Sequence, residues 1–198
     1  MKSKDAQFDC VSAHVSSLSR RDFLRVSAVA VSLSATGLAS VAPSTAFAQV
    51  PEGIVHISVD EYPIWHRLML ALLPTKGSTL VDPETLPVLQ TVDGAFLATL
   101  PPAVLEGLKG GVAYFNEAAK EPFGKPFVDL SLDEASKYCD ALASSEEIPA
   151  RALFTALKFL IVTAYWAIPP TWEPVGFQGP VSEVWGLESQ GNAPLPQA

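Results

Sequence analysis

The sequence predicts an all-α protein: a small helical bundle of about five helices, followed by an irregular C-terminal arm rich in proline, glycine and aromatic residues. Three observations support this fold class. Apolar residues recur three and four positions apart in several segments, as they do on one face of a helix. Long runs of alternating apolar and polar residues, typical of strands, do not occur. Hydrophobic residues make up 48% of the 198 residues and charged residues 17%, a composition that excludes a disordered chain.

The first helix is expected over residues 62–73, after an extended lead-in at 49–59. Ile64, Leu68 and Leu72 are spaced four apart, so they lie on one face of a helix. The Pro-Thr-Lys-Gly sequence that follows contains two residues that end helices. This segment therefore predicts a short amphipathic helix.

A second helix is expected from Pro83 to about Leu97. Asp82 resembles an N-cap, and Pro83 and Glu84 are a proline and an acid suited to a first turn. Pro87 falls within that first turn, where a missing N–H matters least. The segment is therefore expected to continue as one helix.

The remaining helices are predicted by their start signals. Two prolines precede a helix over 103–121, whose glycines at 107, 110 and 111 weaken it or allow another helix to approach closely. Ser131 and Glu134 have the spacing of a capping box and begin a helix that runs to about Ala143. Pro149 opens the last and most hydrophobic helix, which extends to about Ala164. Together these elements form a predicted helical domain at 49–166.

The N-terminal segment predicts export. Arg20 and Arg21 are followed by one residue and then by Phe23 and Leu24, the pattern of a twin-arginine signal. The apolar run at 26–41 is too short and too diluted by serine and glycine to span a membrane. The sequence Ala-Phe-Ala then resembles a cleavage site. We expect residues 1–48 to be a signal peptide and the mature chain to be periplasmic; the alternative is an N-terminal amphipathic helix with a chance arginine pair.

The charge balance argues against a nucleic-acid partner. The chain has 13 basic and 21 acidic residues. The first 48 residues hold five of these basic and three of these acidic residues, so the mature part keeps eight basic and 18 acidic residues, a net charge of −10. Such a surface repels phosphate backbones and attracts basic groups. Cys139 is then the single cysteine, which is buried, free or paired with a thiol of another subunit.

The C-terminal arm at 167–198 is expected to be irregular because prolines and glycines interrupt it. Large aromatic side chains gather in it and immediately before it: Tyr165, Trp166, Trp172, Phe177 and Trp185. Two interpretations remain open. The arm wraps the helices of its own chain, or it docks on another subunit, because aromatic residues are enriched in interface cores.

The sequence predicts no catalytic, cofactor-binding or metal site. It has no glycine-rich dinucleotide fingerprint, no phosphate-binding loop and no haem-attachment motif. His56 and His66 are the histidines of the mature part, and their spacing matches no standard zinc pattern. An alternative function is a stand-alone periplasmic helical binding protein for a metal near these histidines or for a small ligand.

Several short motifs, taken in order, carry a resemblance to a known family. They are Leu72–Pro74, Tyr114–Asn116, Pro122–Gly124, Phe127–Leu130 and Val175–Pro180. Their order behind a twin-arginine leader resembles the small (gamma) subunit of membrane-associated flavin dehydrogenases, the gluconate 2-dehydrogenase subunit 3 family. The resemblance covers most of residues 60–187.

This resemblance implies an accessory role. In the family, a large catalytic subunit of the GMC type holds FAD, oxidises a sugar or another alcohol, and crosses the membrane bound to the small subunit through the twin-arginine translocase. Electrons then pass to a cytochrome c subunit or another acceptor, and the partner subunits associate the complex with the membrane. The resemblance therefore implies that this chain is no enzyme by itself and that FAD belongs to its partner. Trp166, Trp172, Phe177 and Trp185, with Tyr165, are the expected partner contacts, and Cys139 is a candidate for an inter-subunit disulfide.

Overall fold

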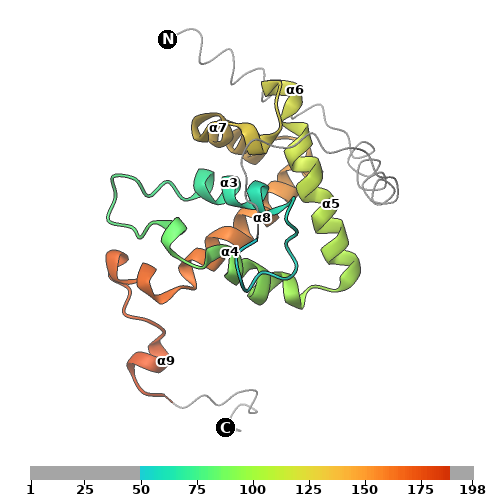
Figure 1. The fold of residues 1–198 in the computed structure, drawn as a ribbon. Helices are drawn as coiled ribbons and strands as arrows, with labels where there is room; N and C mark the ends of the chain where they lie inside the picture. Colours follow the sequence, from blue (N-terminus) through green and yellow to red (C-terminus); the bar gives the residue numbers. More distant parts are fainter. Residues whose placement is uncertain (1–49, 188–198) are drawn as a thin grey trace.

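A computed structural model of the chain describes residues 50–187, and the predicted signal peptide at 1–48 lies outside this range. Every regular element in the described range is a helix, which confirms the all-α fold class. Four helices are longer than ten residues: α3 (Tyr62–Leu72), α5 (Pro102–Ala118), α7 (Leu132–Ala143) and α8 (Ile148–Trp166). Figure 1 shows α8 crossing the middle of the molecule, with α3 and α4 beside it and α7 at one end.

The hydrophobic core lies along one side of α8. This helix packs against α3, α7 and the short α4 (Val88–Thr91), and α3 also packs against α7. Each of these elements contributes fully buried side chains, including Leu68, Val88, Tyr138, Leu157 and Ile161. Within the described range, α8 is the one helix long and apolar enough to cross a membrane. Its contacts with α3, α4 and α7 account for the apolar residues on its inner side.

The predicted helix at 83–97 is wrong as a single element. The chain forms instead a 3-10 turn (Pro83–Thr85), the four-residue α4, a π-helical segment (Val92–Phe96) and another 3-10 turn (Leu97–Thr99). The cause is Pro87, which forces the preceding Leu86 into an extended conformation with φ −118° and ψ 152°. The Asp82 cap was predicted correctly, because its side chain accepts a hydrogen bond from the Glu84 N–H at 3.0 Å.

The predicted helix at 103–121 is divided in two. α5 ends at Ala118, and α6 (Lys120–Phe123) follows it and ends at Gly124, which has the left-handed φ of 73°. Of the three glycines in α5, Gly111 permits a close approach: a Cβ there would lie 2.7 Å from Cδ1 of Leu153 on α8. A Cβ at Gly107 would meet no atom within 4 Å, so that glycine serves no such contact.

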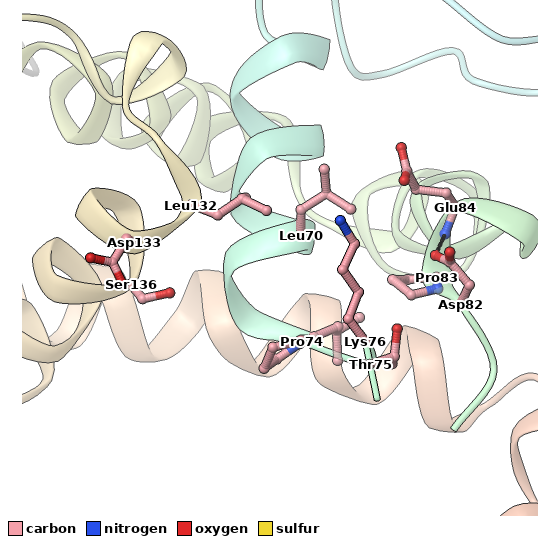
Figure 2. Close-up of a pocket in the computed structure, with 11 residues that line it drawn as sticks. Leu70, Pro74, Thr75, Lys76, Asp82, Pro83, Glu84, Leu132, Asp133 and Ser136 are labelled. Atoms are coloured by element: carbon pink, nitrogen blue, oxygen red, sulfur yellow. Dashed lines mark hydrogen bonds between the residues drawn. The ribbon is translucent and has the colours of Figure 1, made fainter. Parts of the chain in front are cut away.

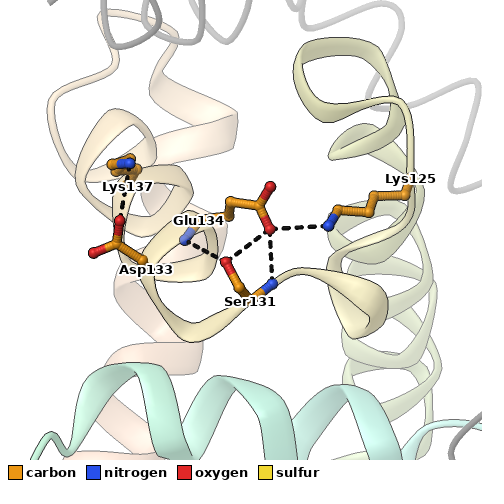
Figure 3. Close-up of polar contacts among 5 residues, drawn as sticks. All are labelled: Lys125, Ser131, Asp133, Glu134 and Lys137. Carbon is orange, nitrogen blue, oxygen red and sulfur yellow. Dashed lines mark hydrogen bonds and ion pairs between the residues drawn. The ribbon is translucent and has the colours of Figure 1, made fainter. Parts of the chain in front are cut away.

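The capping box of α7 is confirmed. The Glu134 N–H donates to the Ser131 hydroxyl, and the Ser131 N–H donates to the Glu134 carboxylate at 2.8 Å. The ammonium of Lys125 lies 2.9 Å from the same carboxylate oxygen (Figure 3). The hydrogen bond from Lys125 and those from Ser131 lower the pKa of Glu134 to about 2. This carboxylate therefore stabilises a helix start.

The lead-in at 50–57 is held to the body by a buried carboxylate. Asp93, in the π-helical segment, accepts hydrogen bonds from three consecutive backbone N–H groups, those of Val55, His56 and Ile57, each at 2.8 Å. Its side chain is buried, so these three donors take the place of water around the charge. The contact joins residues 36 to 38 positions apart, so no local pattern of the sequence predicts it.

Candidate partner-binding surface

The first part of the C-terminal arm is anchored to the helical body. Two 3-10 turns (Pro169–Thr171 and Glu173–Val175) follow α8. Ile168 is buried, and the buried Thr171 hydroxyl donates to the Ile168 carbonyl at 2.8 Å. The indole N–H of Trp172 donates to the Trp166 carbonyl at 2.8 Å, and its ring packs edge to face on Phe177 with the centroids 5.3 Å apart. This part of the arm therefore packs on its own chain.

The second part of the arm is exposed along its whole described length. It contains α9 (Val181–Val184), a single turn, and all residues from Val181 to Leu187 are exposed. Trp185 is 71% exposed, and its apolar neighbours are exposed as well: Val181, Val184 and Leu187. In Figure 1, α9 lies apart from the helices of the body. Interface cores are rich in apolar and aromatic residues, and a tryptophan with three nearby aliphatic residues has that composition.

The five aromatic residues predicted to contact a partner therefore occupy three different environments. Tyr165 is fully buried in the core, and its hydroxyl donates to the Val81 carbonyl at 2.7 Å, so it stabilises the chain's own fold. Trp172 is half-buried and orders the anchored part of the arm. Trp166, Phe177 and Trp185 are exposed and available to another protein.

Cys139 lies inside the body, on the buried face of α7. Burial raises the pKa of its thiol to about 12, so the thiol stays protonated near neutral pH. A disulfide to another subunit would require α7 to leave its packing. The structure thus places this candidate thiol away from the surface.

The two histidines lie in separate places. His56 lines a small cavity with Glu61, whereas the His66 Nε2 lies 3.4 Å from a Glu84 carboxylate oxygen. Burial lowers the pKa of His66, and Glu84 opposes that shift. Within residues 50–187 no group of three or more histidine, cysteine or acidic side chains is arranged to hold a metal ion.

A cavity of about 290 Å³ opens beside Glu84. Figure 2 shows Leu132, Asp133 and Ser136 of α7 on one side, and Asp82, Pro83 and Glu84 on the other, with Leu70, Pro74, Thr75 and Lys76 between them. The cavity has a mostly apolar lining, which includes charged residues of both signs: Lys76, Asp82, Glu84 and Asp133. Its volume is near the lower end of the roughly 300–1,000 Å³ of small-molecule sites. The cavity has room for a small ligand.

Comparison with known proteins identifies the family. The sequence matches the family described as gluconate 2-dehydrogenase subunit 3 over residues 59–179, more than half of the chain. The match begins just before α3 and ends at the last anchored residue of the arm, so it spans the whole helical body. No curated protein and no solved structure matches the chain. The chain belongs to the gluconate 2-dehydrogenase subunit 3 family.

Proposed function

We propose that this chain is the non-catalytic small subunit of a periplasmic, FAD-dependent dehydrogenase of the GMC type, which oxidises a sugar or another alcohol. In this proposal the chain assists folding and assembly of the large flavoprotein subunit and carries it through the twin-arginine translocase. FAD is bound by the large subunit, and a cytochrome c subunit or another acceptor takes the electrons. Family membership supports the accessory role, because the family is described as the third subunit of a dehydrogenase.

The observation that carries the proposal is the exposed end of the arm. An isolated turn of helix gains no stability from its own hydrogen bonds, and exposed apolar side chains gain none from burial. The exposed apolar side chains of this segment therefore add no stability to the chain alone and would add stability once a partner buries them. They are Val181, Val184, Trp185 and Leu187. Trp185 and Phe177 are the proposed contacts to the large subunit.

The leader supports the export part of the proposal. Arg20 and Arg21 are the recognition pair of the signal. By the family resemblance, the large subunit has no leader of its own and crosses with the small subunit. We therefore expect one signal to direct two proteins to the periplasm, where the complex associates with the membrane through its other subunits.

The test is capture of the full-length chain, tagged at its C-terminus, from the periplasm of its source cells. We expect a flavin absorbance spectrum and a co-purified band several times larger than the chain. Trp185→Ser should reduce the flavin recovered by about 10-fold or more, because a central tryptophan contact is worth about 2 kcal/mol. Val104→Ser, at an apolar α5 residue that is 52% exposed, is the matched control and should leave recovery unchanged.

A second experiment in the same cells tests whether the chain carries the flavoprotein across the membrane (the escort role). Arg20→Lys with Arg21→Lys should hold both the chain and the flavoprotein in the cytoplasm, as fractionation would show. A flavoprotein that still reaches the periplasm contradicts the escort. A colourless, solitary chain in the capture contradicts the accessory role and points instead to a binding protein that uses the cavity beside Glu84.

A further inference from the structure

α8 has a second apolar face, and no described part of the chain covers it. Its buried side chains, among them Phe154, Leu157 and Ile161, face the core. On the opposite side Phe159 is 61% exposed and Ile148 is 53% exposed. The contacts of α8 with its neighbours account for one side of the helix and leave this other side open to solvent.

The exposed residues lie along one side of the helix, with the half-buried Val162 and Thr163 between Phe159 and Trp166. These exposed residues are Ile148, Ala152, Thr155, Ala156, Phe159 and Trp166. At 100° per residue these positions fall on one side of the helix, over a length of roughly 28 Å. A shallow groove of about 460 Å³ runs along the first five of them, and Arg151 lines one edge. We call these six residues the α8 outer face.

The α8 outer face is continuous with the arm. Trp166 is the last residue of the outer face, and its carbonyl accepts the hydrogen bond from the indole of Trp172. The anchored part of the arm therefore starts where the outer face ends. A partner that covers the outer face up to Trp166 therefore also meets the start of the arm.

An interface of the size that an escorted partner needs is larger than the exposed end of the arm. Two subunits that fold and travel together share an obligate interface of roughly 2,000 Å² or more, while a standard interface already takes about 20–30 residues a side. Within the described residues, the exposed end of the arm offers seven, from Val181 to Leu187. The α8 outer face is the further apolar surface that such a complex needs.

Charge indicates which kind of partner fits. α8 contains no acidic residue, and its cations, Arg151 and Lys158, lie along one edge of the outer face. Two copies of this chain paired through α8 would bring these cations together, and an anionic membrane would face a mature chain with a net charge of −10. An apolar protein surface with acidic residues at its edge is complementary to the α8 outer face and its cations.

We propose that the α8 outer face binds the large catalytic subunit, as the second part of the surface that begins at the arm. This inference rests on the proposed function. Phe159 is its central contact, and Lys158 pairs with an acidic group at the edge of the partner.

The test uses the full-length tagged chain, captured from the periplasm as above. Phe159→Asp should lower the flavin recovered per mole of chain by about 10-fold or more, because it places a charge in an apolar contact. Thr155→Arg fills the groove from another position and should have the same effect, so the result does not depend on one side chain.

Lys158→Glu should cause a smaller loss that high salt reduces. Val104→Asp, on α5, is the control and should recover flavin as the wild type does. Far-UV circular dichroism and thermal unfolding establish that each variant is folded.

The outcomes separate the two proposals. If the wild type recovers the flavoprotein and both Phe159→Asp and Thr155→Arg recover it equally well, the outer face is not the docking surface, and the accessory role stands. If the wild type recovers no flavoprotein, the proposed function itself fails. Light scattering that shows a dimer dissociated by Phe159→Asp would assign the face to a second copy of the chain. Sedimentation with phosphatidylglycerol vesicles that Phe159→Asp abolishes would assign it to a membrane. Either of these two results overturns the inference.

Discussion

At the scale of single residues, Asp93 connects two parts of the chain that are distant in sequence. Its two carboxylate oxygens accept three backbone N–H groups from residues 55–57, and no other described side chain bonds these amides. Such charged hydrogen bonds contribute about 1.5–3 kcal/mol each, and a buried N–H without an acceptor costs about 1–3 kcal/mol. The lead-in that follows the predicted cleavage site is therefore held by this carboxylate in addition to the buried side chain of Ile57.

Asp93→Ala should lower the free energy of unfolding of the mature chain by about 3 kcal/mol or more, because it leaves three donors without their acceptor. Asp93→Asn should have a smaller effect, since its remaining amide oxygen can accept the two N–H groups that Oδ1 accepts in the wild type. Urea unfolding measures the loss, and hydrogen exchange at the Val55–Ile57 amides locates it. An Asp93→Ala protein as stable as the wild type, with these amides still protected, would contradict this account.

At the scale of the helix, Glu134 makes the start of α7 sensitive to pH. The pKa of its carboxylate is about 2 in the folded chain and near 4.5 when unfolded. A lowered pKa stabilises the fold above pH 4.5, and this stabilisation is lost as the pH falls from 4.5 towards 2. Glu134→Gln should therefore lower the stability at pH 7 by about 1–2 kcal/mol, since glutamine keeps a cap but loses the ion pair with Lys125. Near pH 2 the two proteins should unfold alike.

The matched control is the preceding residue of the same helix. Asp133 forms an exposed i,i+4 ion pair with Lys137, at 3.1 Å, and takes no part in the cap (Figure 3). Asp133→Asn should therefore change the stability by no more than about 0.5 kcal/mol at any pH. Thermal unfolding of both variants between pH 2 and 7 measures the difference. Equal losses at pH 7 would show that general charge effects, and not the capping box, stabilise α7.

The sequence predicts local features of the helices well and distant contacts poorly. The capping box and the start of α8 depend on residues within one turn, so their spacing identifies them. The prediction of one helix at 83–97 was wrong because Pro87 lies four residues beyond Pro83. There it excludes Leu86 from the helical conformation, and this outweighs the tolerance of a first turn for proline. The Asp93 contact spans 36 to 38 positions. The sequence indicates this contact only by a single acidic residue, Asp93, within an otherwise mostly apolar segment.

At the scale of the whole molecule, the sequence predicts where apolar residues gather and not which of them the fold covers. Tyr165 and Trp166 are neighbours, yet one is fully buried and the other exposed, because successive helix positions differ by 100°. α8 is apolar on nearly all sides, so its periodicity does not distinguish the core face from the outer face. That distinction comes from the packing of α3, α4 and α7, which is known only in three dimensions.

The same packing divides the C-terminal arm into a part that stabilises the chain and a part that is free for a partner. A mature chain ending at Gly179 keeps Ile168, Thr171 and the Trp172–Phe177 pair, so its stability should match that of the full mature chain within about 0.5 kcal/mol. A chain ending at Ala167 exposes the pocket of Ile168 and should lose about 2–3 kcal/mol, or roughly 5–10 °C in Tm. Calorimetry of the two truncated chains measures this. If the chain ending at Gly179 is the one that melts early, residues after 179 pack on the body, and their exposure no longer argues for a partner.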